Sequence, residues 1–75
     1  MKLSVSMLSP VERLLYLFIR NEETTTLIDI YRFRGKDDAH TRRVLRRLTF
    51  LNLITIRTPK DQKRIRIIKL KKYIV

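Results

Sequence analysis

The chain contains no cysteine, no tryptophan, one glycine and one histidine in its 75 residues. Without cysteine there is no disulfide framework, no thiolate nucleophile and no thiolate metal ligand. A single histidine excludes a histidine-rich metal cluster, and we expect neither a metal nor a cofactor. A chain of this length is near the lower size limit for a self-sufficient core and has no room for a large active-site cleft as well. We therefore expect one domain over residues 1–75 that is not an enzyme.

Long hydrophobic runs are also missing. LLYLFI at residues 14–19 is among the longest apolar stretches, and it is far shorter than the roughly 20 residues needed to span a bilayer. The N-terminal residues do not show the succession of basic, apolar and small residues that marks a secretory signal. We expect no membrane partner and an intracellular, cytoplasmic protein, associated with a nucleoid or, for a viral protein, located in the host cytoplasm.

Acidic residues are scarce, and basic residues are unevenly distributed. Seven Asp and Glu face 18 Lys and Arg, for a net charge of +11. Residues 1–30 carry three basic and four acidic side chains, whereas residues 31–75 carry fifteen and three. Such dense positive charge attracts nucleic acid first, an anionic membrane surface second and an acidic protein third. Eleven of the 18 are arginine, whose planar fork suits phosphates and guanine edges, so the composition favours nucleic acid.

The first half of the chain predicts two helices after a short N-terminal segment. Residues 1–8 alternate apolar and polar side chains, which is typical of a strand or an arm. Ser9, Pro10 and Glu12 form a capping-box start for a helix that should end near residues 21–23. Its predicted core stripe is Val11, Leu14, Leu15 and Phe18.

TTTLIDIYRFRG, residues 24–35, predicts a second and shorter helix. A threonine caps it, Thr26 and Asp29 have capping-box spacing, and Gly35 supplies a left-handed exit. The predicted buried face of this helix is Leu27, Ile28 and Tyr31.

A third helix should follow, capped by Asp37 or Asp38. Adjacent carboxylates at a helix start are far more often caps than acid–base catalysts. Asn52 tolerates a positive φ and can end this helix. LITIRT and KRIRIIKL, separated by a turn at residues 59–62, then predict a basic β-hairpin. The helix should bury Thr41, Val44, Leu45, Leu48 and Leu51 and leave Arg42, Arg43, Arg46 and Arg47 on its other faces.

The stretch Leu45-x-x-Leu48-x-x-Leu51-Asn52-Leu53-Ile54 resembles the LxxLxxxGLI pattern that ends the recognition helix of winged helix-turn-helix proteins. Asn52 stands where that family usually has glycine, and both residues adopt the left-handed conformation. The resemblance covers about residues 9–70. Within the family, the chain is similar to small archaeal or viral regulators. Its predicted second and third helices also resemble the winged-helix domain of archaeal replication initiators, whose ATPase portion this chain lacks.

The resemblance implies an α+β fold of three helices followed by a two-stranded β-hairpin wing. It further implies a sequence-specific regulator of transcription that binds double-stranded DNA, with the third helix in the major groove and the wing on the backbone or minor groove. Independently of the resemblance, an α-helix fits the major groove, where arginine bonds bidentately to guanine. We expect a homodimer on a two-fold site, and no small-molecule substrate is evident.

The predicted DNA-binding residues fall into three groups. Base edges are assigned to His40, Arg42, Arg43 and Arg46, early in the third helix. Phosphates are assigned to Arg47 and to the wing residues Arg57, Lys60, Lys63, Arg64 and Arg66. The helix start at residues 24–26, with Thr25, offers N–H groups and hydroxyls to a phosphate, and Lys36 completes the set.

Several alternatives stay open at this stage. The arginine face could be a solvated surface without a partner, and Phe50 could pack under the N-terminal arm or join a dimer. The terminal Tyr73-Ile74-Val75 could pair with that arm within one chain or across a two-fold axis. A sequence-neutral DNA-coating protein, or a winged-helix module that docks an acidic protein, would carry the same charge pattern.

Overall fold

The computed structural model describes residues 3–36, 39–62 and 64–75, which form an α+β domain. Three α-helices and a three-stranded antiparallel sheet with strand order β1-β3-β2 make up this part of the chain. Among these residues, no helix combines the length and the apolar character that crossing a bilayer requires. In chain order the elements are η1 (Val5–Met7), α1 (Pro10–Glu22), β1 (Thr24–Thr26), α2 (Leu27–Arg34), α3 (Ala39–Phe50), β2 (Ile54–Arg57) and β3 (Ile67–Leu70).

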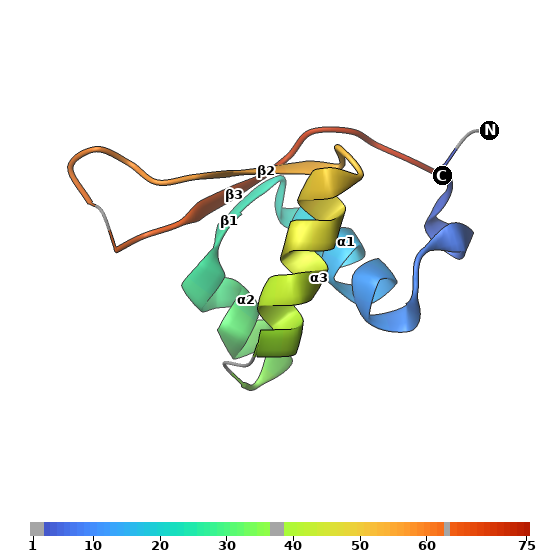
Figure 1. The fold of residues 1–75 in the computed structure, drawn as a ribbon, viewed down its shortest axis with the longest axis horizontal. Helices are drawn as coiled ribbons and strands as arrows, with labels where there is room; N and C mark the ends of the chain where they lie inside the picture. Colours follow the sequence, from blue (N-terminus) through green and yellow to red (C-terminus); the bar gives the residue numbers. More distant parts are fainter. Residues whose placement is uncertain (1–2, 37–38, 63) are drawn as a thin grey trace.

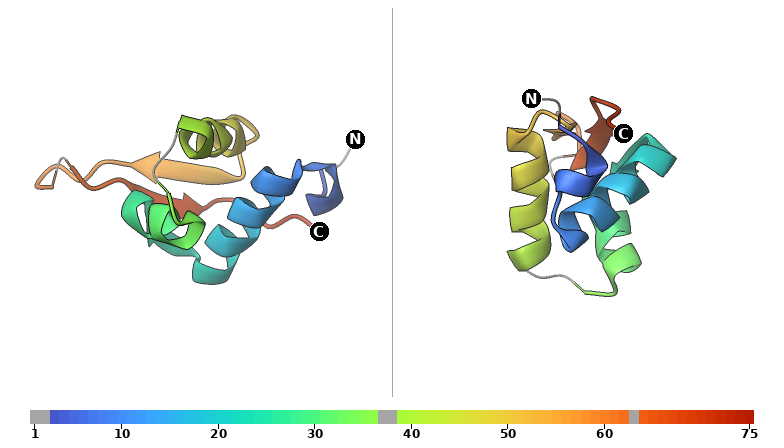
Figure 2. Two further views of the ribbon diagram at one scale, coloured as in Figure 1. Left: turned by 90° about the horizontal axis from the view of Figure 1, so that it is seen from below. Right: turned by 90° about the vertical axis from the view of Figure 1, so that its right-hand side faces the viewer.

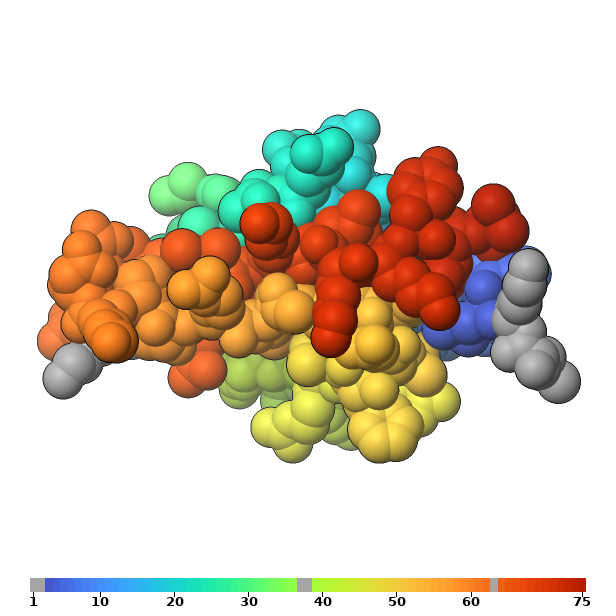
Figure 3. All heavy atoms as spheres, turned by 90° about the horizontal axis from the view of Figure 1, so that it is seen from above, coloured from blue at the N-terminus to red at the C-terminus, as the bar shows by residue number. Residues whose placement is uncertain are grey.

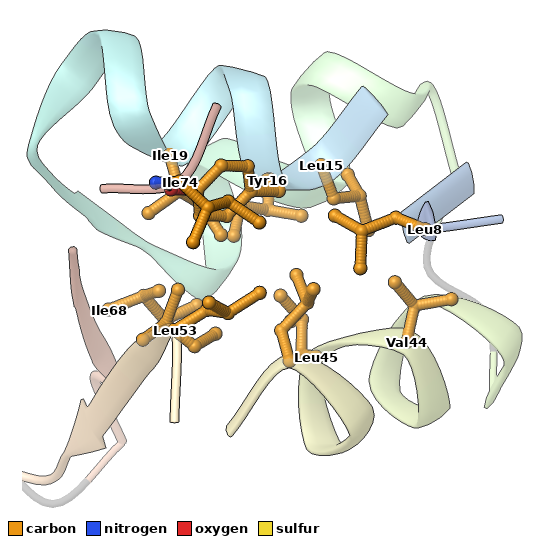
Figure 4. Close-up of a cluster of buried hydrophobic side chains, with 12 residues drawn as sticks. Leu8, Leu15, Tyr16, Ile19, Val44, Leu45, Leu53, Ile68 and Ile74 are labelled. Carbon is orange, nitrogen blue, oxygen red and sulfur yellow. Dashed lines mark hydrogen bonds between the residues drawn. The ribbon is translucent and has the colours of Figure 1, made fainter. Parts of the chain in front are cut away.

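Figure 1 shows the arrangement of the helices and the sheet, and the buried side chains between them form one hydrophobic core in the described part of the chain. Viewed along the longest axis in Figure 2, α3 lies on one side and α1 with α2 on the other, with the sheet across the top. Figure 4 shows Leu15 of α1, Leu45 of α3 and Ile68 of β3 pointing into the space between these elements, where all three are buried. Because burial of apolar surface is the main favourable term in folding, this core fixes the orientation of α3.

The predicted start and end of α1 are confirmed, but its predicted buried face is wrong in part. The backbone N–H of Ser9 donates to Glu12 Oε1 (2.9 Å), and the N–H of Glu12 donates to Ser9 Oγ (3.4 Å), which completes the capping box. The core side of the helix carries Leu15, Tyr16 and Ile19, whereas Leu14 is 46% exposed. Because residues 14–19 are all apolar, no polar residue marks the solvent face, and the sequence pattern fits more than one orientation of the helix.

The structure of residues 24–26 differs from the predictions for the second helix and for the sheet. They form β1, which pairs antiparallel with β3, so the sheet has three strands where two were expected. The helix begins only at Leu27, with Thr26 Oγ1 accepting from the N–H of Asp29 (3.2 Å). Its fully buried residue is Ile30, and the predicted Ile28 is 51% exposed. The left-handed exit at Gly35 (φ 77°) is confirmed.

The third helix follows the prediction closely. Thr41, Val44, Leu45 and Leu48 are buried and Leu51 is partly buried. Asn52 has a φ of 67° and ends the helical segment, as its tolerance of the left-handed region predicts. The predicted caps, Asp37 and Asp38, lie outside the described residues.

The predicted pairing of LITIRT with KRIRIIKL is confirmed, although the second strand is shorter than the alternation indicates. β2 and β3 are antiparallel, with Ile56 opposite Ile68 and Arg57 opposite Ile67. Ile68 is buried on the helix side and Ile67 is half-buried on the other side, so apolar residues occupy both faces where the alternation breaks. β3 starts only at Ile67, and the residues before it belong to the connecting loop.

The described part of the N-terminal segment contains the short 3₁₀ helix η1, so of the two expectations for it, a strand or an arm, the strand is wrong. The N–H of Val5 donates to the carbonyl oxygen of Val75 (2.6 Å), and η1 and the last residues lie side by side at one end of the molecule in Figure 1. Val5 and Val75 therefore meet within one copy of the chain. Phe50 does not pack under this segment, because it is 79% exposed.

Tyr16 and Arg20 of α1 hold the last residues of the chain in place. The Tyr16 hydroxyl donates to the carbonyl of Lys72 (2.6 Å) and accepts from the N–H of Ile74 (2.9 Å). Arg20 Nη1 donates to the carbonyl of Ile74 (2.9 Å), and its guanidinium lies 4.4 Å from the centre of the Tyr73 ring. The side chain of Ile74 is thereby kept in the core.

Replacing Tyr16 with phenylalanine should lower the free energy of unfolding by about 2 kcal/mol, because it leaves a carbonyl and an N–H without their partner at a buried position. Urea denaturation followed by circular dichroism measures the loss. Tyr73→Phe makes the same chemical change, loss of a hydroxyl, on an exposed ring. It should change the free energy of unfolding by less than about 0.5 kcal/mol. Equal losses in the two variants would show that the Tyr16 hydrogen bonds do not stabilise the fold.

Candidate nucleic-acid interface

The core orients the exposed faces of α3. Successive residues of an α-helix are about 100° apart around its axis. With Leu45 and Leu48 pointing into the core, Arg43, Arg46 and Phe50 fall near the opposite, outward direction. All three are exposed. We call the strip formed by Arg43, Arg46 and Phe50 the outward strip of α3.

The remaining predicted residues of this helix lie on its two flanks. Arg42 lies on the flank nearest the sheet, where its Nη1 donates to the hydroxyl of Tyr31 on α2 (3.3 Å). His40 and Arg47 lie toward the other flank, and the Arg47 guanidinium is 5.8 Å from the centre of the Phe50 ring. The five basic side chains assigned to α3 are all exposed, so the structure brings them together around one helix.

A groove of about 490 Å³ separates α3 from the sheet. Arg42 and Arg46 line it from α3, and Arg66 lines it from the residue just before β3. The other lining residues are apolar or uncharged, namely Leu27, Leu45, Thr49, Phe50, Ile56 and Ile68. The groove therefore joins one of the predicted wing arginines to those of the helix.

The register of the sheet separates Arg57 from Arg66. Side chains alternate between the two faces of a strand. Ile68 is buried against the helices, so Ile67 and its partner Arg57 belong to the outer face of the sheet. The predicted wing residues thus occupy two surfaces: Arg66 faces the groove, and Arg57 faces away from it.

The described residues of the loop between β2 and β3, 58–62 and 64–66, project from the body of the molecule. Figures 1 and 3 show them extending beyond the helices at one end. Lys60 and Arg64 are exposed on this loop, where their charges can reach past the volume occupied by α3. Lys63 lies outside the described residues.

Two residues outside α3, Lys36 and Thr25, were also predicted to bind DNA, and the structure places them differently. Lys36 is exposed directly after Gly35, near the end of α2. Thr25 is in strand β1 and only 7% exposed. The phosphate contact assigned to it assumed that residues 24–26 form a helix start. The cap at Thr26 is confirmed, but Thr25 belongs to strand β1, so the contact assigned to Thr25 loses its premise.

The sequence prediction omitted three lysines near the chain end. Lys69 is exposed on the outer face of the sheet, opposite Thr24 and Thr55. Lys71 donates from Nζ to Asn52 Oδ1 (2.6 Å), and Lys72 is exposed beside it. The alternation around the buried Ile68 could have placed Lys69. With Arg57, it gives the outer sheet face a positive charge of its own.

Few of these charges are paired with a carboxylate of the described residues. The one salt bridge found among the described residues joins Arg32 Nη1 and Asp29 Oδ1 of α2 (3.7 Å), and both side chains are exposed. Arg43, Arg46 and Arg66 form no ion pair with any carboxylate in this part of the chain. The outward strip and Arg66 in the groove therefore present positive charge to an external polyanion.

The described residues contain no group of three His, Asp or Glu side chains placed to hold a metal ion. Comparison of the chain with protein-family models, with curated proteins and with solved structures finds no match in any of the three. A functional assignment therefore depends on the residues and geometry of this chain.

Proposed function

We propose that this protein is a winged helix-turn-helix regulator of transcription that binds double-stranded DNA. The element order supports the assignment: α1, β1, α2 and α3 are followed by the antiparallel β2–β3 pair with its projecting loop. In this reading α2 and α3 form the helix-turn-helix, and the β2–β3 pair with residues 58–66 is the wing.

The observation that carries the proposal is the arginine surface of α3. The diameter of an α-helix with its side chains, about 10–12 Å, matches the roughly 12 Å width of the major groove. Arg43 and Arg46 on the outward strip would then reach base edges, where a guanidinium can donate two hydrogen bonds to one guanine. Lys60 and Arg64 would meet the backbone on the flank of the major groove, where contacts give affinity without sequence preference.

Selection of binding sites from random duplex oligonucleotides tests the proposal. A regulator should enrich a defined motif. Failure to shift any duplex at low salt would contradict DNA binding and favour the docking of an acidic protein. RNA is a weaker candidate partner, because the exposed side chains of the sheet include threonines, Lys69 and Arg57 rather than the aromatic rings that stack unpaired bases.

The division of roles among the basic residues gives a sharper prediction. Arg43→Ala and Arg46→Ala should each lower the ratio of cognate to random-sequence affinity by about 5- to 150-fold, because a base contact is worth about 1–3 kcal/mol. Lys60→Ala should weaken both affinities alike. Fluorescence anisotropy on the selected site and on a scrambled duplex measures the ratio, and equal ratios in all three variants would refute the division.

Sequence-neutral coating of DNA is the second candidate function. It is favoured by the second basic surface on the outer face of the sheet, where Arg57 and Lys69 lie away from the groove. Such a surface would let one copy contact two duplexes. A selection that returns duplexes but no motif would support coating, and a recovered motif would support the regulator.

The homodimer is part of the proposal, and we infer that it forms through the exposed side of α1. Leu14 and Leu17 leave apolar surface on that helix, and residues 1–30 carry almost no net charge. A dimer through Phe50 would instead cover the outward strip that the duplex needs. The same selection tests the dimer, because two-fold symmetry predicts an inverted repeat with half-sites about 10 base pairs apart.

A further inference from the structure

The groove between α3 and the sheet has an apolar floor that a duplex does not require. Leu27 of α2 and Ile56 of β2 are half-buried, so part of their surface is open to solvent within the groove. Behind them lie Leu45 and Ile68, which belong to the core. Phosphodiester backbone would satisfy the arginines at the rim but would bury little of this apolar surface, because its outer side is charged and hydrated.

The rim of the groove is cationic on both sides. Arg46 lines it from α3 and Arg66 from the position just before β3, and none of the described residues lining the groove is acidic. A guanidinium binds a carboxylate with charge-assisted and often bidentate hydrogen bonds. The volume of about 490 Å³ lies within the roughly 300–1,000 Å³ range of small-molecule sites, which combine apolar walls with a few polar groups.

We propose that this groove binds an amphipathic carboxylate, with the apolar body on Leu27 and Ile56 and the carboxylate between Arg46 and Arg66. Both halves of the site are needed, because the floor alone would accept any apolar molecule and the arginines alone any small anion. In a regulator of the kind proposed above, the ligand would compete with the duplex for Arg46. That competition rests on the proposed function; the binding site itself does not.

Octanoate is a suitable probe, with octanamide and acetate as matched controls. Octanamide keeps the apolar body without the charge, and acetate keeps the charge without the body. Titration of the full ¹⁵N-labelled chain, followed by amide chemical shifts, should show saturable octanoate binding with a Kd of about 1 mM or below. The shifts should concentrate on residues that line the groove, and both controls should bind at least about tenfold more weakly.

Charge-removing variants locate the carboxylate. Arg46→Gln and Arg66→Gln should each raise the Kd for octanoate about tenfold. Arg57→Gln makes the same change in charge on the opposite face of the sheet, and it should leave the Kd within about twofold because an exposed charge at a distance is screened by salt. All three replacements are at exposed positions, so they test the site without disturbing the core.

Four results would overturn the site: no saturable shifts, equal binding of octanoate and octanamide, equal binding of octanoate and acetate, or equal effects of Arg57→Gln and Arg66→Gln. Competition is tested separately by adding octanoate to a preformed complex with duplex DNA. Release of the duplex supports it, and a duplex that stays bound at saturating octanoate overturns it. A protein that binds no duplex would still give the octanoate titration, so the two failures are distinguishable.

Discussion

Raising the salt concentration from 50 to 200 mM should weaken duplex binding by about 10³- to 10⁴-fold. This follows if about 6 to 8 phosphates are neutralised, since each contact releases counterions and the slope of log K against log salt is then roughly −5 to −7. The described cations around α3, the groove and the projecting loop are numerous enough to supply these contacts. Anisotropy titrations at five or more salt concentrations give the slope directly.

A matched pair of variants tests whether the salt dependence of duplex binding comes from the basic residues of α3, the groove and the loop. Arg32→Ala removes an arginine that already lies 3.7 Å from the carboxylate of Asp29, and it should leave the slope nearly unchanged. Arg64→Ala removes an exposed loop cation and should make the slope shallower by about one. A wild-type slope shallower than about −2 would mean that few phosphates are contacted, and the proposed interface would then be wrong.

Leu48→Ala should cost about 3 kcal/mol of the free energy of unfolding. Leu48 is fully buried in the core that joins α1, α3 and the sheet, and such a truncation loses transfer free energy and leaves a cavity. Small domains have only about 5–15 kcal/mol of stability in total, so this single change removes a large fraction of it. Chemical denaturation monitored by circular dichroism measures the loss.

The exposed Ile28 on α2 provides the comparison. Truncation to alanine there removes an aliphatic side chain that is 51% exposed, and it should cost less than about 1 kcal/mol. Duplex binding by Leu48→Ala, measured under conditions where it remains folded, should be close to that of wild type because Leu48 does not face the outward strip. Similar stability of the two variants would contradict the central place of Leu48 in the core.

α1 and β1 show where local sequence patterns were insufficient. Residues 14–19 are apolar without a break, so their order could not distinguish Leu14, which faces solvent, from Tyr16, which faces the core. The threonines at residues 24–26 suit a helix cap and a strand equally well. Their choice depends on β3, whose residues lie more than 40 positions later in the chain, and no local pattern reports a partner at that distance.

The sequence pattern also could not show which wing arginines face the groove, because this depends on contacts with segments far along the chain. Alternation along KRIRIIKL places Arg64 and Arg66 on one side, but the break at Ile67-Ile68 hides which side faces α3. The pairing of Ile67 with Arg57, and the burial of Ile68, decide it. Residues that appeared equivalent in the sequence are therefore divided between the groove and the outer face of the sheet.

The sequence by itself determined what short-range chemistry controls: the capping box at Ser9, the left-handed exits at Gly35 and Asn52, and the leucine face that turns the α3 arginines outward. These depend on neighbours within a few residues, whose spacing is visible in the chain. Only the tertiary structure decided the third strand, the solvent face of α1 and the placement of Arg46 and Arg66 along one apolar groove. Each of these requires contact between segments far apart in sequence, and packing rather than local preference selects such contacts.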